Sequence, residues 1–351
     1  MTILYYSPPY DIKANALTDP GKQRPRVPEG FYAFNDPISE ELIESMSVSR
    51  APSPPRKIRN SNKTFYDKIE PWLFLIPAMA VFSVFLFFPF GKTIYLSTFL
   101  TDKYGTAKVF VGFKNFSDIL FGTRSREFWN SMWVTVRFVF FVTLGGLAMG
   151  IITSLLTEKR FPGYAFASAI FAMPIAIASS ASSMSFKMIL NPTIGLLNKV
   201  LGTHINWLNE VSYAFPIICI LAVWMATGIN FIFISAGFRN VPAELYESAS
   251  IDGANGWHKF RFITLPCISP TLFFQVIIDV INAFQTFNIV KILTLGGPME
   301  STNTIVYSIY LDAFRNFRFG GAAARSIILF LIIMIITLIQ FRAEGRSVHY
   351  Q

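Results

Sequence analysis

Residues 244–266 read ELYESASIDGANGWHKFRFITLP, a polar stretch between two long apolar runs. The flanking runs, 213–237 and 266–290, are long enough to cross a bilayer, because about 20 apolar helical residues span its hydrocarbon core. A polar segment between two such spans must lie at a face of the membrane. The role of this segment therefore decides what kind of membrane protein the chain forms.

The composition of the whole chain also points to a membrane protein. Of its 351 residues, 52% are hydrophobic and only 15% are charged, whereas an average soluble domain is about a quarter charged. The sequence predicts an all-α membrane protein whose transmembrane domain covers 66–351. Its six predicted spans are 72–97, 129–157, 162–187, 213–237, 266–290 and 322–341.

Charge distribution predicts the orientation. Residues 1–65 hold nine of the 20 prolines and mixed charge, which predicts a disordered tail. Residues 50–68 are strongly basic and directly precede the first span, as expected of a cytoplasmic segment. We therefore expect a multi-pass protein of the cytoplasmic (inner) membrane with both termini and the 239–265 loop in the cytoplasm. The basic cluster explains the net charge of +9 without a nucleic-acid partner.

The residues of the 239–265 loop predict a helix, a glycine turn and a second helix. Pro242 suits a first helical turn, and Glu244 and Glu247 favour a helix N-terminus. Gly253 can end that helix in a left-handed conformation, after which Trp257 resumes the apolar spacing. From these residues alone, the segment is either an interfacial linker or a docking surface.

A family resemblance favours the docking surface. The pattern E-x-A-x-x-D-G-A, followed by F-R-x-I-T-L-P, resembles the cytoplasmic coupling loop of ABC importer permeases. The matching or adjacent positions are Glu247, Ala249, Asp252, Gly253 and Ala254. The resemblance implies that residues 244–264 form a coupling helix that docks into a cleft of an ATP-hydrolysing subunit.

Four further motifs resemble the binding-protein-dependent sugar branch of that family, the maltose-permease-F-like and glycerol-phosphate-permease-A-like subunits. They are FVGFKNF at 110–116, FWNS at 128–131, NWLN at 206–209 and LTLGGP at 293–298. The resemblance implies four kinds of partner: a second homologous permease, two cytoplasmic ATPase subunits, an extracellular solute-binding protein and the lipid bilayer. It implies an ATP-driven importer of a sugar or oligosaccharide, or alternatively of glycerol-3-phosphate or a related phosphodiester.

The sequence predicts a transport subunit that is not itself an enzyme. FGKT at 90–93 ends like a phosphate-binding loop, but Leu86 stands where that motif needs its first glycine. A membrane-embedded enzyme is the alternative from another class, yet the three histidines are far apart in sequence. We therefore expect no cofactor on this chain, with ATP and Mg bound by the partner ATPase.

Polar residues in the fifth span are the candidates for a solute path. They recur at i, i+4, i+7 and i+11, which places them on one helical face: Gln275, Asp279, Asn282 and Thr286. A charged side chain at mid-bilayer costs about 2.5–3.5 kcal/mol, so its presence needs a reason. Either this polar stripe, 275–286, contacts solute, or its side chains form hydrogen bonds to neighbouring helices. Asn230 and the serines at 179–183 are weaker candidates of the same kind.

Two arginines lie toward the predicted outer halves of their spans, Arg137 and Arg325. They could bind a phosphate, but we expect them to extend toward the lipid headgroups, as long cationic side chains often do. Because the sequence shows no deep arginine cluster, it favours a neutral oligosaccharide as cargo.

Overall fold

The computed structural model describes residues 65–158 and 161–347. The chain divides into two units, Met1–Leu73 and Phe74–Gln351. The predicted tail, 1–65, lies outside the described residues except for Phe65. The described part consists of helices joined by loops and turns, and one two-stranded antiparallel sheet of β1 (Phe99–Thr101) and β2 (Ala107–Phe110).

Among the described residues, five single helical stretches are long and apolar enough to cross a membrane, and they lie over five of the predicted spans. They are Trp72–Ser97, Ser125–Leu156, Val211–Arg239, Ser269–Leu293 and Phe319–Glu344. The first comprises most of α2 (Phe65–Phe82), the π-helical turn η1 (Ser83–Phe87) and α3 (Phe88–Ser97). The others contain α5 (Ser125–Leu156), α9 (Val211–Arg239), α13 (Ser269–Phe284) with α14 (Asn288–Leu293), and most of α16 (Phe319–Ser347).

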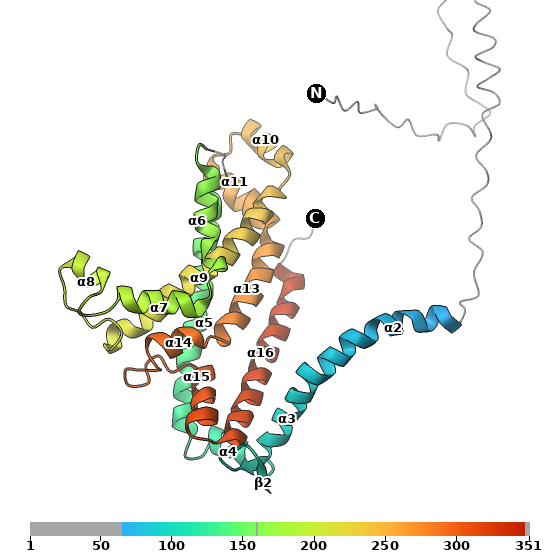
Figure 1. Ribbon diagram of the computed structural model, residues 1–351. Helices are drawn as coiled ribbons and strands as arrows, with labels where there is room; N and C mark the ends of the chain where they lie inside the picture. The colour runs from blue at the N-terminus through green and yellow to red at the C-terminus, as the bar shows by residue number, and fades with distance from the viewer. Residues whose placement is uncertain (1–64, 159–160, 348–351) are drawn as a thin grey trace, which may run out of the picture. The chain divides into compact units, whose positions relative to one another are not determined.

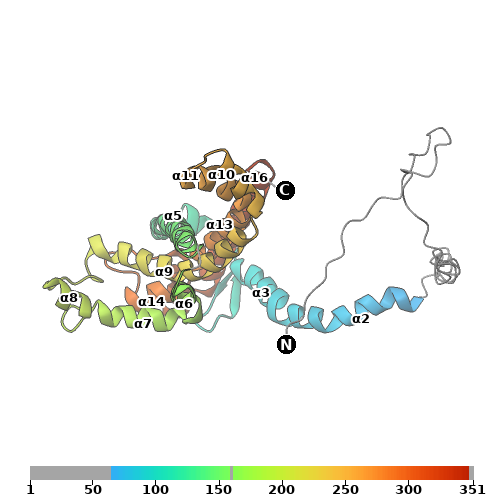
Figure 2. The ribbon, with the colours of Figure 1, turned by 90° about the horizontal axis from the view of Figure 1, so that it is seen from above.

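The third predicted span, 162–187, is a bent pair of helices, which together are apolar enough to form one broken span or a re-entrant loop. It forms α6 (Tyr164–Ala176) and α7 (Ser179–Ile189), which are bent by 103°. Pro174 lies in the last turn of α6, and Ile177 and Ala178 are extended, so the helix cannot continue. In Figure 2, α5 is seen along its axis, whereas α7, which leads to α8 (Leu196–Leu201), is seen from the side.

The centre of the bundle is the packing of α5 against α9, with α13 against both. Gly146 and Gly150 on α5 make this possible, because small residues four apart let two helices approach closely. A Cβ atom added at Gly150 would lie 2.6 Å from the Cβ of Asn230, and one at Gly146 would lie 3.0 Å from that of Ala226. No larger residue fits at position 150 without moving α9.

Short elements gather at one end of this unit, called the far end below. They are the sheet, α4 (Lys114–Leu120), α15 (Ile305–Tyr310), the π-helical turn η3 (Leu311–Arg315) and the start of α16 (Figure 1). Asn115 joins them by donating hydrogen bonds to the backbone oxygens of Ser97 (2.8 Å) and Phe99 (3.0 Å). The opposite end carries α10 (Ala243–Ile251), and is called the knob end.

The expectation that Arg325 extends toward headgroups is wrong. Arg325 has no exposed surface. Its Nη1 lies 3.1 Å from Glu127 Oε1, its Nε lies 3.2 Å from Asp312 Oδ2, and Nη1 also donates to the Ser308 hydroxyl. Carboxylates from α5 and η3 thus neutralise the guanidinium inside the far end. Arg137 is only partly buried and stacks on Phe215, 4.8 Å from the ring centre.

Candidate functional site

The predicted coupling segment has the expected form of a helical hairpin. Helix α10 ends at Ile251, and Gly253 follows with φ +77°, a conformation that costs little for glycine alone. The chain returns through α11 (Gly256–Lys259), the π-helical turn η2 (Phe260–Thr264) and α12 (Leu265–Cys267). This hairpin, 243–264, is called the knob, and it projects where α9 ends and α13 begins (Figure 1).

Internal hydrogen bonds fix the shape of the knob. The Tyr246 hydroxyl lies 2.8 Å from Thr264 Oγ1, and Lys259 Nζ donates to Ser250 Oγ at 2.7 Å. The Asn255 side chain caps α11 by accepting from the His258 backbone N–H at 2.9 Å. Partial burial raises the pKa of the Tyr246 phenol. Because both arms are bonded to each other, the knob can act as one rigid lever on α9 and α13.

The outer surface of the knob has the chemistry of a docking site. Ile251 is 86% exposed and Trp257 is 68% exposed, and no residue of α10 is buried. Glu247 and Asp252 are exposed, and neither belongs to an ion pair among the described residues. Exposed apolar side chains beside unpaired charges are typical of a protein interface. The five predicted coupling residues all lie on α10 or its turn, with Ala249 and Ala254 partly buried.

A cavity of about 400 Å³ lies between α5, α7, α9 and the α13–α14 pair; its lining mixes apolar and polar side chains, and it is called the polar cavity below. Three of the four predicted solute-path residues line it: Asp279, Asn282 and Thr286. Gln275 is fully buried and is absent from this lining. Ser179, Gln285 and Asn288 add further polar groups to the wall.

The predicted stripe divides into two halves with different surroundings. Asp279 is buried, and its Oδ2 accepts a hydrogen bond from Asn230 Nδ2 at 2.8 Å, which links α13 to α9. Gln275 Nε2 lies 3.5 Å from the other carboxylate oxygen. Asn282, by contrast, is exposed and Thr286 is partly exposed. Asp279 therefore makes the interhelical bond that one of the two interpretations predicts, and Gln275 supports it from within α13. Asn282 and Thr286 have the exposure that a solute path needs.

Two acceptors beside the carboxylate are left without partners. Gln275 Oε1 and Asn230 Oδ1 are buried, and neither receives a hydrogen bond among the described residues. Buried acceptors of this kind are costly unless a donor reaches them. Neither residue lines the cavity, so these two acceptors belong to the buried contact of α13 with α9.

Some residues of the cavity were ranked low or missed from the sequence. From the sequence, Ser179 is only a weak candidate and Asn288 is not singled out. Asn230, also a weak candidate, bonds to Asp279 but does not line the cavity. Asn288 Nδ2 donates to Ser179 Oγ at 2.9 Å and so joins α14 to α7. Asn288 lies off the helical period of the stripe because α13 ends at Phe284 and a new helix begins. Only the bend between α6 and α7 brings Ser179 to this place.

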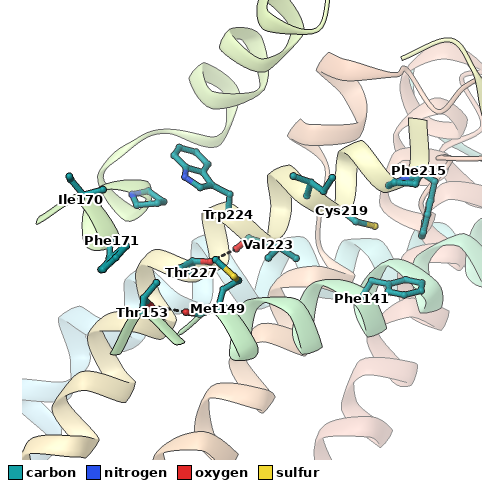
Figure 3. Close-up of a pocket in the computed structure, with 13 residues that line it drawn as sticks. Phe141, Met149, Thr153, Ile170, Phe171, Phe215, Cys219, Val223, Trp224 and Thr227 are labelled. Carbon is teal, nitrogen blue, oxygen red and sulfur yellow. Dashed lines mark hydrogen bonds between the residues drawn. The ribbon is translucent and has the colours of Figure 1, made fainter. Parts of the chain in front are cut away.

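A second, larger cavity of about 730 Å³ lies between α5, α6 and α9 and is apolar (Figure 3). Phe141, Phe171 and Trp224 are among the side chains around it. Its two threonine hydroxyls are bonded within their own helices, Thr153 to Met149 O (2.7 Å) and Thr227 to Val223 O (2.8 Å). Because this lining offers apolar side chains and no free hydroxyl, it suits hydrocarbon chains and not a hydroxyl-rich solute. The smaller cavity is therefore the candidate solute site.

Comparison with known proteins agrees with this arrangement. The chain is 34% identical over 290 residues to the sn-glycerol-3-phosphate transport system permease protein UgpA of Agrobacterium fabrum, covering 82% of this chain and 98% of the relative. It is 36% identical over 292 residues to UgpA of Rhizobium meliloti, with the same coverage. A solved bacterial alginate ABC transporter, in complex with an alginate pentasaccharide-bound periplasmic protein, has a chain of the same fold. Its TM-score is 0.70 at 22% identity, over 80% of this chain and 97% of that chain.

The family assignment covers most of the described helices. Residues 119–347 match the family of the binding-protein-dependent transport system inner membrane component. The matched range begins in α4 and includes α5, the knob, the polar cavity and α16. The chain belongs to this family, the inner-membrane permeases of binding-protein-dependent ABC transport systems.

Proposed function

We propose that the chain imports a sugar or oligosaccharide as one permease subunit of an ATP-driven transporter. Its partners would be a second homologous permease, two cytoplasmic ATPase subunits and an extracellular solute-binding protein. The family's dependence on a binding protein supports this assembly. The alginate structure, which holds a pentasaccharide-bound periplasmic protein, supports a carbohydrate as the class of cargo.

The knob would couple the ATPase to the helical bundle. Its contact residues are Glu247, Ala249, Asp252, Gly253 and Ala254. The observation that carries this role is the exposed Ile251 and Trp257 beside unpaired carboxylates, on a hairpin held rigid from within. Since the knob continues into α9 and α13, a movement of the ATPase would reach both walls of the polar cavity.

Catalysis and nucleotide binding would then belong to the partners. ATP and Mg would bind to the ATPase, and this chain would bind no cofactor and catalyse no reaction. Both termini would lie in the cytoplasm. The end of α16 supports this for the C-terminus, because it lies toward the knob end in Figures 1 and 2.

The polar cavity would be part of the solute path. Asn282 and Thr286 would contact the cargo directly, while Asp279 would present its carboxylate from a position fixed by Asn230 and Gln275. The alternative cargo is glycerol-3-phosphate or a related phosphodiester, which the UgpA relatives favour by name. Both cargo classes carry hydroxyl groups that suit this wall.

Reconstitution tests the proposal. The complete complex in proteoliposomes loaded with ATP should accumulate radiolabelled maltooligosaccharide or sn-glycerol-3-phosphate when the solute-binding protein is added, and not without ATP. Asn282→Ala should lower this uptake, whereas Asn209→Ala, an exposed residue outside the cavity, should not. Accumulation that continues without ATP or without the ATPase subunits would show that the chain works by another mechanism.

A further inference from the structure

A lysine lies beside the polar cavity at the end away from the knob. Phe287 lines the cavity immediately before α14, and Lys291 follows one helical turn later. Lys291 Nζ lies 5.2 Å from the centre of the Phe287 ring and 4.7 Å from that of Tyr310 on α15. The ammonium group is thus held over two aromatic faces next to the wall of the cavity.

Further aromatic rings support this position. The Phe287 and Tyr310 rings are 5.0 Å apart, Tyr307 stacks on Tyr310 at 6.0 Å, and Phe314 lies 5.4 Å from Tyr310. Aromatic faces attract a cation through their quadrupole without neutralising its charge. The wall of rings therefore positions the Lys291 ammonium and leaves the charge available.

No carboxylate among the described residues pairs with Lys291, in contrast to the buried Arg325 at the far end. None of the ion pairs among the described residues includes Lys291, whereas Arg325 lies between two carboxylates. Lys187 on neighbouring α7 is already engaged, because its Nζ donates to Ile292 O at 3.0 Å. Lys291 is only partly buried, so a solute could reach it.

The cavity therefore has groups of opposite character at its two ends. Asp279 lines the cavity at its deep end, where its carboxylate attracts hydroxyl donors. Lys291 lies beyond Phe287 at the other end. An anionic group would be repelled by the carboxylate and attracted by the ammonium, while hydroxyls would be satisfied at the deep end.

We propose that Lys291, held by Phe287 and Tyr310, forms an anion-selecting subsite of the solute path. Its ligand is a polyhydroxylated solute that carries one phosphate or carboxylate group, such as a polyol phosphate or an acidic sugar. The inference rests on the proposed function and narrows its substrate class. It departs from the neutral cargo that the sequence favours, because that expectation depends on the arginines of the spans and does not include Lys291.

Lysine footprinting tests the subsite without requiring transport. The assembled complex is placed in nanodiscs of phosphatidylcholine, so that no anionic lipid headgroup can supply the phosphate. Its lysines are acylated with a water-soluble reagent and quantified by mass spectrometry. Protection is compared between two matched pairs of probes: sn-glycerol-3-phosphate with glycerol, and glucuronate with glucose, all at equal ionic strength.

The charged member of at least one pair should slow acylation of Lys291 by roughly tenfold, as expected of a charge-assisted contact. The neutral member should have no such effect, and exposed Lys199 on α8 should react alike in every sample. Equal protection by charged and neutral probes, or protection by neither anion, overturns the proposal.

Uptake kinetics separate this inference from the proposed function. Lys291→Gln should raise the KM for the anionic solute by roughly tenfold, and Lys291→Arg should restore most of the affinity because it keeps the charge. Lys199→Gln is the matched control and should leave KM unchanged. An unchanged KM in Lys291→Gln removes the subsite but leaves the importer intact. A complex that binds ATPase subunits yet transports neither probe, with Lys291 still protected, contradicts the proposed function alone.

Discussion

The two ends of the helical bundle use charge in opposite ways. At the far end, Arg325 is fully buried between Asp312 and Glu127, which come from η3 and α5. At the knob end, Glu247 and Asp252 are exposed and have no ion pair among the described residues. A buried charge must be paired because its desolvation is costly. An exposed unpaired charge costs little and can meet a partner, so one end is built as a fixed frame and the other as a docking surface.

Breaking the buried ion pairs should have the largest effect. Arg325→Met removes the nearer and fully buried cation of the two that pair with Asp312 in the described part of the chain, and leaves that buried carboxylate with only half-exposed Arg318 at 4.0 Å. We expect a loss of about 3–5 kcal/mol in the free energy of unfolding, as when one partner of a buried pair is removed. Thermal denaturation of the purified complex measures this.

Arg318→Gln is the matched control for the frame. Arg318 is half exposed and lies 4.0 Å from the same Asp312, so its loss should cost at most about 1 kcal/mol. If Arg325→Met and Arg318→Gln unfold at the same temperature, the buried pairs do not hold the far end together.

Packing of α5 against α9 should show the next largest effect. In Gly150→Ala the new methyl group would lie 2.6 Å from the Asn230 Cβ, and we expect overpacking to cost about 1–3 kcal/mol. Gly91→Ala in α3 is the control, since nothing lies within 4 Å of the added atom. It should be neutral or slightly stabilising in the same denaturation experiment. Equal stability of the two variants would argue against close contact at Gly150.

A substitution in the knob should change stability least and coupling most. Gly253→Val meets no neighbouring atom but must adopt φ +77°, which costs an ordinary residue about 1–2 kcal/mol. Because the strain falls on the docking turn, we expect weaker binding of the ATPase subunits, measured by titration of the purified permease pair. Gly256→Ala has open space and no positive φ, so it should bind normally. Loss of binding in both variants would point to a general effect of the side chain and not to the turn.

Much of this architecture could be predicted because it follows from local sequence. The spans are set by apolar length, and the knob by Pro242, Gly253 and the acidic Glu244 in the first turn of α10. Hydropathy could not reveal the bend after Pro174, because the residues on both sides of it are uncharged and compatible with a span. That bend breaks the third predicted span into α6 and α7, and Ser179, the first residue of α7, lines the cavity.

Pairings between distant segments could not be predicted from the sequence. Arg325 meets Glu127 across 198 positions, and Asn230 meets Asp279 across 49. The stripe from Gln275 to Thr286 was visible as a helical face, but its division into a bonded half and an accessible half depends on where α9 lies. Lys291 could not be recognised from the sequence for the same reason, since one of the two rings it contacts, Tyr310, belongs to α15.

Docking of the knob on the ATPase is tested most directly by site-specific photocross-linking in the assembled complex. A benzoylphenylalanine at exposed Trp257 should form a covalent adduct with the ATPase subunit, and the same residue at Ile251 should do so as well. The probe at Trp133 on α5, which is 60% exposed but lies outside the knob, should not. If the ATPase co-purifies with the permease while neither knob position forms an adduct, the knob is not the coupling surface.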